Sequence, residues 1–276
     1  MKILKHTLAA GLVLCAGVSA FMNENGVIPG LFQVEANFDY VSYRNAYSDG
    51  NHSSFGKDAS QMNLMPTVRF RPLDGLEFSF GYPVRNDDDF KNATGFWGPI
   101  LGIKYGSPYS AGFFDLVFPS GSKKLLGNGD NPQPVLVFGF TDVFGGRSSF
   151  DVRLHSWYWL DLNENSADKM LFLIRPEFST GAVRIGIGLP IEFYFGSDSD
   201  GWINNAPGHV RAQGLTADDN DLGYAGDISI EPKVLIKLGK LELEPGFSVP
   251  IAKFSNKEAV LYYGYTISMA ARVNLF

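Results

Sequence analysis

The chain has 276 residues, and its 23 Lys and Arg residues against 29 Asp and Glu residues give a net charge of −6. This acidic balance argues against nucleic-acid partners, because such partners require a basic surface. The single cysteine, Cys15, lies in a segment that we expect to be removed on export, which excludes disulfides, thiolate metal sites and a cysteine nucleophile from the mature chain.

Residues 1–20 have the features of a secretory signal peptide. A short positive start precedes an apolar stretch over 8–18, and the small residues up to Ala20 are of the kind that a signal peptidase recognises. The stretch is too short to cross a bilayer as a retained helix. Apolar residues before Cys15 leave a lipoprotein anchor open as an alternative. We expect the mature domain to span 21–276.

Strict alternation of apolar and polar residues begins in the first predicted strand, 31–43. Side chains two apart in a strand share a face, so this pattern separates an apolar face from a polar one. Each predicted strand is about as long as a tilted membrane strand requires. The same pattern, regular or weaker, recurs over 62–71, 76–82, 99–105, 110–118, 134–142, 150–158, 170–178, 183–193, 227–238, 241–249 and 263–275.

The connections between these strands alternate in length. The short ones are 72–75, 106–108, 145–147, 179–181 and 239–240, and the long ones are 44–60, 84–98, 119–133, 161–169, 196–226 and 252–259. A soluble sandwich has no reason for this alternation, whereas outer-membrane barrels have short periplasmic turns and long extracellular loops. The sequence predicts an all-β fold, a transmembrane antiparallel up-and-down β-barrel of about twelve strands in a bacterial outer membrane.

Two short motifs carry a narrower resemblance. Glycines are spaced before Lys-Tyr over Gly98–Tyr105, and Phe118–Gly121 reads Phe-Pro-Ser-Gly. In these motifs the chain resembles the transporter-like barrels associated with the phenol meta-cleavage pathway, distant relatives of the long-chain fatty-acid channels. The resemblance implies passage of small, often apolar, molecules across the outer membrane. The chain also ends in Phe276, as outer-membrane proteins do, which implies recognition by the barrel-insertion machinery.

The polar face of the strands would line the lumen, and it divides into two sectors. The expected charged lining is Glu35, Asp39, Arg69, Lys104, Asp115, Arg153, Arg175, Glu177, Arg184, Glu192, Asp227, Glu231, Lys233, Glu242, Glu244 and Arg272. The expected apolar lining is Ile100, Phe113, Val117, Val135 and Val137, although in 134–142 the opposite set, Leu136, Phe138 and Phe140, fits equally well. Aromatic residues near the long loops, including Trp157–Trp159, would form an interfacial girdle.

Four strands carry a proline near their long-loop end: Pro83, Pro119, Pro190 and Pro250. Proline cannot donate to a ladder, so each residue ends or kinks strand pairing. One interpretation is ordinary termination before a loop. The other is a ring of kinks that narrows the mouth or opens a lateral gap. Pro190 tests the two, because apolar alternation continues beyond it.

Three functional hypotheses follow. A charged wall facing a partly apolar wall suits a channel for small solutes, amphipathic or aromatic ones included. Alternatively, side chains fill the lumen, as in many small barrels, and the long loop 196–226 has a structural or adhesive role. A hydrolase is the third hypothesis, with His155 and His52 as its histidines, but the chain has no Gly-x-Ser-x-Gly or His-Glu-x-x-His motif.

No cofactor and no metal are expected. Acidic residues at 87–89, 198–200 and 218–221 have oxygen ligands at close spacing, but they do not continue into a complete calcium loop. The expected partners are outer-membrane lipid and lipopolysaccharide, the barrel-insertion machinery and a small-molecule solute.

Overall fold

The computed structural model describes residues 24–48, 50–88, 93–96, 98–119, 133–145, 149–162, 167–196, 210–213, 223–255 and 260–276. The expected signal peptide and the acidic segments at 198–200 and 218–221 lie outside these residues. Within the described part of the chain, no helix is long and apolar enough to cross a membrane.

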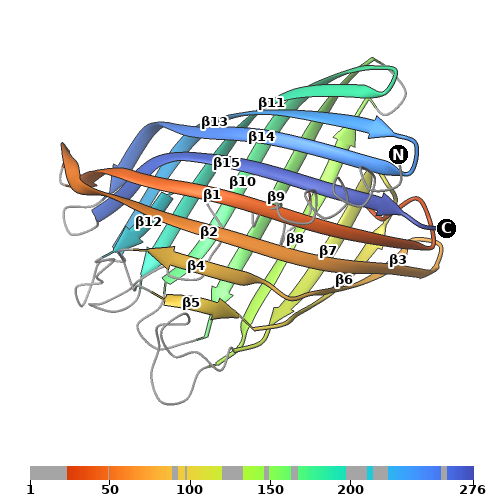
Figure 1. The fold of residues 1–276 in the computed structure, drawn as a ribbon, viewed down its shortest axis with the longest axis horizontal. Coiled ribbons are helices and arrows are strands. Elements are labelled where there is room, and N and C mark those ends of the chain that lie inside the picture. The colour runs from red at the N-terminus through yellow and green to blue at the C-terminus, as the bar shows by residue number, and fades with distance from the viewer. Residues whose placement is uncertain are drawn as a thin grey trace, which may run out of the picture.

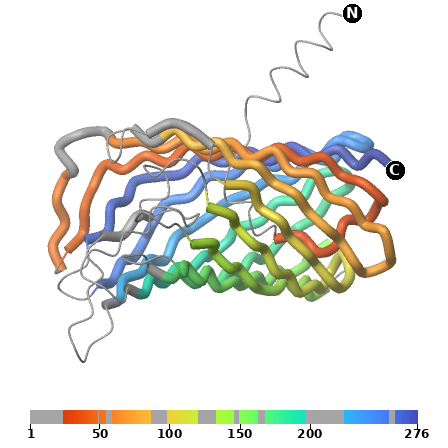
Figure 2. Tube along the Cα trace, turned by 90° about the horizontal axis from the view of Figure 1, so that it is seen from below, coloured from red at the N-terminus to blue at the C-terminus, as the bar shows by residue number. Residues whose placement is uncertain are grey.

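The described strands form one antiparallel sheet that closes on itself (Figures 1 and 2). Their bounds are β1 (Phe32–Ser48), β2 (Asn51–Leu73), β3 (Leu76–Gly81), β4 (Val84–Asp88), β5 (Ala93–Phe96), β6 (Ile100–Gly106), β7 (Ser110–Val117), β8 (Val135–Phe144), β9 (Phe150–Asp161), β10 (Ala167–Thr180), β11 (Val183–Gly196), β12 (Val210–Gln213), β13 (Gly223–Leu238), β14 (Leu241–Ser255) and β15 (Val260–Asn274).

Closure follows from the pairing of the first strand on both sides. β1 pairs with β15 and with β2. β3 and β4 pair with successive parts of β2, so together they act as one interrupted strand. β6 pairs with β3 and β5 pairs with β4, so β5 and β6 together act as the next one. The result is a closed 12-strand barrel, which confirms the predicted fold class and strand number.

The barrel wall is apolar outside and polar inside. In β1, the Val34 side chain is 40% exposed, whereas Glu35 is fully buried. A soluble domain of this size has no reason to expose an apolar band and bury charges, but a barrel surrounded by lipid has one. Large apolar side chains exposed on the outer face include Val68, Phe70, Phe78, Phe80, Leu101, Ile103, Phe114, Phe172, Ile174, Ile185, Ile187 and Ile267.

The two ends of the barrel differ, as the sequence predicts. At the end that holds the C-terminus, which we call the short-turn end, tight turns contain glycines at positive φ: Gly75, Gly106, Gly145, Gly181 and Gly239. The opposite, long-loop end departs from prediction, because β1 and β2 extend as a hairpin through most of 44–60. Alternation disappears where both faces of a strand are largely polar, although the hydrogen-bonded pairing of β1 and β2 continues. The sequence pattern therefore underestimates the length of these strands.

β14 and β15 pair over only part of their length. Their pairing ends at Ser248↔Thr266, although β14 continues to Ser255. Beyond that point β15 pairs with β12, which contacts residues 260–263. A strand from the long connection 196–226 therefore completes the wall beside β15 at the long-loop end.

The four prolines differ in their effect on pairing. Pro83 separates β3 from β4, and Pro119 follows the end of β7. Pro190 lies inside β11 and keeps its register with Leu173 of β10. Pro250 lies inside β14, just beyond the point where pairing with β15 ends. Termination thus describes Pro119, whereas β11 and β14 continue through their prolines. A narrowed mouth or a lateral gap stays a prediction.

Candidate functional site in the barrel lumen

An apolar sector covers one side of the lumen. The expected residues Ile100, Phe113, Val117, Val135 and Val137 are all buried there. Phe138 and Phe140 face outward at 47% and 46% exposure, which resolves the ambiguity in the strand 134–142. The full apolar sector is one cluster formed by Met65, Ile100, Phe113, Val117, Val135, Val137, Trp157, Trp159, Leu171 and Leu173.

The predicted interfacial girdle is wrong for the two tryptophans of 157–159, which belong to the apolar sector. Trp157 and Trp159 are 5% and 0% exposed and face inward, and the residue between them, Tyr158, faces outward. Alternation along β9 gives this result directly, because His155 and both tryptophans share one face. The aromatic composition of the segment suggested an interface, but the period of two decides the side.

The structure places the predicted charged residues on the inner face, buried or partly buried: Glu35, Asp39, Arg69, Lys104, Asp115, Arg153, Arg175, Glu177, Arg184, Glu192, Asp227, Glu231, Lys233, Glu242, Glu244 and Arg272. Sequence reasoning gives this face but not the pairing partners. The partners come from neighbouring strands, and two sets of ion pairs stand out.

The first set is a line of five alternating charges across β3, β2, β1, β15 and β14, which we call the closing ladder. Arg69 contacts Glu77 at 2.9 Å and Glu35 at 2.8 Å. Arg272 contacts Glu35 at 2.9 Å and Glu244 at 2.6 Å. Each of its arginines thus lies between two carboxylates, and Glu35 joins the two arginines where the barrel closes.

The second set lies on β9, β10, β11 and β13 and forms a basic cradle. Arg153 binds both oxygens of Glu177, with its Nε at 2.8 Å and its Nη2 at 3.1 Å. Arg175 and Lys233 share Glu231, at 2.7 Å and 2.6 Å. We use the term basic cradle for Arg153, Arg175, Arg184 and Lys233. The cradle has more basic groups than its own wall neutralises.

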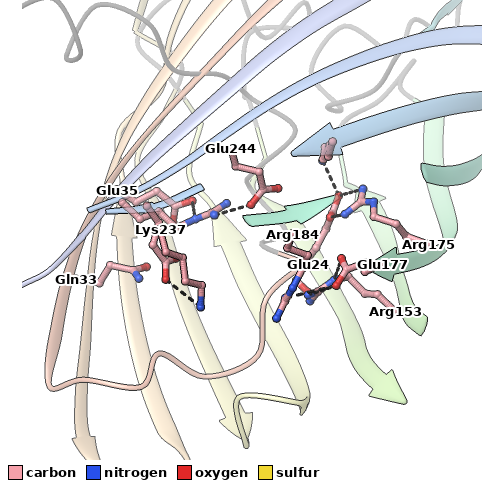
Figure 3. Close-up of polar contacts among 12 residues, drawn as sticks. Glu24, Gln33, Glu35, Arg153, Arg175, Glu177, Arg184, Lys237 and Glu244 are labelled. Carbon is pink, nitrogen blue, oxygen red and sulfur yellow. Dashed lines mark hydrogen bonds and ion pairs between the residues drawn. The ribbon is translucent and has the colours of Figure 1, made fainter. Parts of the chain in front are cut away.

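Residues 24–30, which we call the N-terminal segment, enter the lumen and complete this cradle. The Glu24 carboxylate binds both terminal nitrogens of Arg175 (Figure 3). It also accepts a hydrogen bond from Lys233 at 3.0 Å. Arg153 Nη1 donates to the Glu24 carbonyl oxygen at 2.6 Å. Burial alone would raise the pKa of Glu24, but the charges of Arg175 and Lys233 outweigh it and hold that pKa well below its usual value.

The rest of the N-terminal segment crosses the lumen at the short-turn end. Lys104 Nζ donates to the Asn25 carbonyl oxygen at 2.7 Å. The Ile28 amide donates to Glu77 at 2.8 Å, and the Val27 amide donates to the Ser107 carbonyl at 3.0 Å. Sequence reasoning missed this segment, because it has no alternation and lies before the first predicted strand.

A cavity of about 290 Å³ lies against the N-terminal segment at the short-turn end. Apolar groups of Val27, Val143 and Leu235 form part of its wall. Its basic lining side chains are Arg69, Arg153, Arg184, Lys237 and Arg272, and its one acidic lining side chain among the described residues is Glu242. The cavity therefore joins the basic cradle to the short-turn mouth.

A third buried group lies toward the long-loop end, and it adds Lys169, which the predicted lining lacks, to the predicted Glu192. Lys169 is fully buried and contacts Glu192 at 2.8 Å. Its ammonium lies 4.9 Å from the Tyr194 ring centroid and 5.5 Å from that of Trp157. Lys169 lies two residues before Leu171 and therefore on the same face, but the predicted strand 170–178 begins one residue too late to include it.

His155 and His52, the two histidines of the hydrolase hypothesis, each contact one hydroxyl in the described part of the chain. His155 Nδ1 lies 2.7 Å from the Thr141 hydroxyl, and its ring stacks on Phe113. His52 Nδ1 lies 2.8 Å from the Tyr263 hydroxyl. A threonine–histidine contact lacks the orienting carboxylate of a triad. Among the described residues, no cluster of three or more metal-ligating side chains occurs.

Comparisons with known proteins place the fold. No protein-family model and no curated protein matches the chain. The COG4313 outer membrane channel from Pseudomonas putida F1 matches at 12% identity and a TM-score of 0.61, over 91% of this chain and 97% of that one. The outer membrane protein Omp33 of Acinetobacter baumannii matches at 9% identity and a TM-score of 0.35, over 89% and 98%. The first of these shows that this chain shares its fold, a closed antiparallel β-barrel, with a known outer-membrane channel.

Proposed function

We propose that the protein is a channel for passive passage of small solutes across the bacterial outer membrane, with amphipathic and aromatic solutes as its substrate class. The observation that supports this most is the divided lining of the lumen, in which the apolar sector lies on β2 and β6 to β10, the basic cradle lies on β9 to β13, and the closing ladder lies on β1 to β3, β14 and β15. A solute with an apolar body and a polar group finds complementary contacts on the two parts of this lining. A lumen filled only for stability has no reason to separate the two.

The orientation follows from the ends of the barrel. We assign the short-turn end to the periplasm and the long-loop end to the exterior, as in other outer-membrane barrels. The apolar outer face would contact lipid and lipopolysaccharide, and the barrel-insertion machinery would be the folding partner. The N-terminal segment then lies at the periplasmic mouth, held mainly by side-chain contacts rather than by strand pairing.

The test is ion conductance of the purified mature protein in planar bilayers. Amphipathic solutes cross bare lipid, so their block of the ion current is a sharper readout than their flux. We expect small conductance steps that benzyl alcohol reduces and a pentose of similar size does not. A bilayer that stays silent with the wild type and with a variant lacking residues 21–30 would contradict the channel.

A structural or adhesive barrel is the second candidate, and the pairing of β12 with β15 bears on it. This pairing ties part of the 196–226 connection to the wall, where an adhesive loop would project outward. Removing residues 206–217 separates the two functions. A change in conductance with unchanged surface binding supports the channel, whereas unchanged conductance with lost surface binding supports adhesion.

A further inference from the structure

The Glu24 carboxylate occupies a built anion site. The side chains of Arg175 and Lys233 that hold it are 3% and 9% exposed. Both belong to the barrel wall, on β10 and β13, whereas Glu24 belongs to the N-terminal segment. The anion is thus the one member of the contact that can leave without any change in strand pairing.

The wall alone leaves this site positively charged. Glu231 is shared between Arg175 and Lys233, and Glu177 is shared between Arg153 and Arg184. The next carboxylate along the wall, Glu244, binds Arg272 of the closing ladder. Once Glu24 is absent, the four basic groups of the cradle are therefore ion-paired with only two wall carboxylates, Glu177 and Glu231. A buried excess of positive charge is costly, so the cradle strongly favours an anion in that place.

Glycines fix the shape of the site. A Cβ at Gly186 would lie 2.7 Å from Arg175 Cδ, and one at Gly188 would lie 3.1 Å from Arg175 Nε. The missing side chains on β11 let the arginine extend flat over the strand and present its terminal nitrogens. A planar guanidinium held in this way matches the two oxygens of a carboxylate better than a single point charge does.

Space for a ligand body adjoins the site. The cavity of about 290 Å³ shares Asn25, Arg153, Arg184 and Leu235 with the surroundings of Glu24. Its apolar groups could cover a small ring or a short alkyl chain. Displacement of the N-terminal segment would enlarge this space on the side of the cradle.

We propose that Arg153, Arg175 and Lys233 form a lumen site for small monocarboxylates, and that Glu24 occupies it as a tethered competitor in the resting protein. A solute carboxylate replaces Glu24 on Arg175 and Lys233, and the N-terminal segment loses its anchor. This inference rests on the proposed channel function and specifies a carboxylate as the polar group of the solute.

The experiment compares benzoate with its neutral analogue benzamide on the full mature protein. Equilibrium dialysis against the folded protein in detergent measures binding, and block of the ion current in planar bilayers measures occupancy of the channel. Glu24→Gln removes the competing charge and keeps the side-chain size. We expect it to strengthen benzoate binding by about tenfold or more, because charge-assisted hydrogen bonds to the competitor are lost, and to leave benzamide unchanged.

Two further variants locate the effect. Lys233→Met in the Glu24→Gln background should abolish the gain, whereas Lys237→Met, which removes a half-exposed lysine of the same cavity, should preserve it. Equal gains for benzamide, or a gain that survives Lys233→Met, would overturn the site. Inorganic phosphate that competes as well as benzoate would show a general anion site instead of a carboxylate site.

The equilibrium-dialysis measurement tests the carboxylate site independently of the channel function. Benzoate binding to the Glu24→Gln protein together with silent bilayers would refute the channel and leave the site standing. Conducting bilayers together with no benzoate binding would refute the site and leave the channel standing.

Discussion

Replacing Glu35 by Gln should weaken the barrel where β1 closes onto β15. Glu35 is fully buried and accepts hydrogen bonds from Arg69 at 2.8 Å and from Arg272 at 2.9 Å. Glutamine keeps the shape but removes the charge that both arginines share. Breaking a buried ion pair costs about 3–5 kcal/mol. Each arginine retains a second carboxylate in the closing ladder, so we expect a loss of about 3 kcal/mol, at the low end of that range.

The matched control is Glu242→Gln. Glu242 lies 3.5 Å from Lys237, whose side chain is 50% exposed. An exposed pair of this kind contributes at most about 1 kcal/mol. Both variants remove one negative charge from the inner face, so the difference between them isolates the effect of burial and bridging.

Urea unfolding of the barrel in thin lipid vesicles measures both variants. The fluorescence of the buried Trp157 and Trp159 should follow loss of the apolar sector, and gel mobility should follow loss of the closed barrel. A Glu35→Gln protein no less stable than Glu242→Gln would refute the reasoning. In addition, the combined loss in Glu35→Gln/Arg69→Met should be smaller than the sum of the single losses, because the two side chains share one contact.

Three further outcomes are expected. Gly26→Val should raise the conductance, because a Cβ at Gly26 would collide with the backbone of the Ser107–Pro108 turn and displace the N-terminal segment. The control is Gly112→Val, whose Cβ would have one ordinary contact at 3.8 Å, and it should leave the conductance unchanged. Acidification should release the N-terminal segment, and so raise the conductance, only well below pH 4.5. The pKa of Glu24 is depressed, so its charge anchors the segment above that pH and is lost only as the pH falls through the pKa of the folded state. A rise in conductance near pH 6 in bilayer recordings would contradict this. Gly102→Val should destabilise the barrel by about 1–3 kcal/mol in urea unfolding, because its Cβ would meet the side chains of Asp115 and Ser79, and a stability equal to that of Gly112→Val would be the contrary result.

The strand pattern predicted the fold because the barrel imposes a period of two on every residue that crosses the membrane. Val34 and Glu35 lie on opposite faces for this reason, and so do Val137 and Phe138. The pattern failed where that constraint ends. The β1–β2 hairpin continues beyond the apolar band, where both faces of each strand are polar and the alternation carries no signal.

Contacts within the lumen could not be derived from the pattern. Glu35 and Arg272 are 237 residues apart, and only the closure of β1 onto β15 brings them together. Alternation assigns each of them to the inner face but does not give the register between the two strands. The position of the N-terminal segment was harder still, because neither periodicity nor a motif marks Glu24 as a partner of Arg175.

The way the lumen is neutralised bears on how it can change. In the closing ladder, wall residues neutralise wall residues, and those pairs can break only if strands separate. At the basic cradle the balancing charge belongs to the N-terminal segment, which is covalently continuous with the wall through β1 and otherwise held by hydrogen bonds and ion pairs. The charge of the lumen can therefore change at the cradle while the barrel stays intact. The apolar sector contributes no charge to this balance, and it meets the segment's contacts at Lys104, which donates to Asn25 and lies 5.7 Å from the Phe113 ring centroid. Movement of the segment would therefore alter mainly the charged part of the lining.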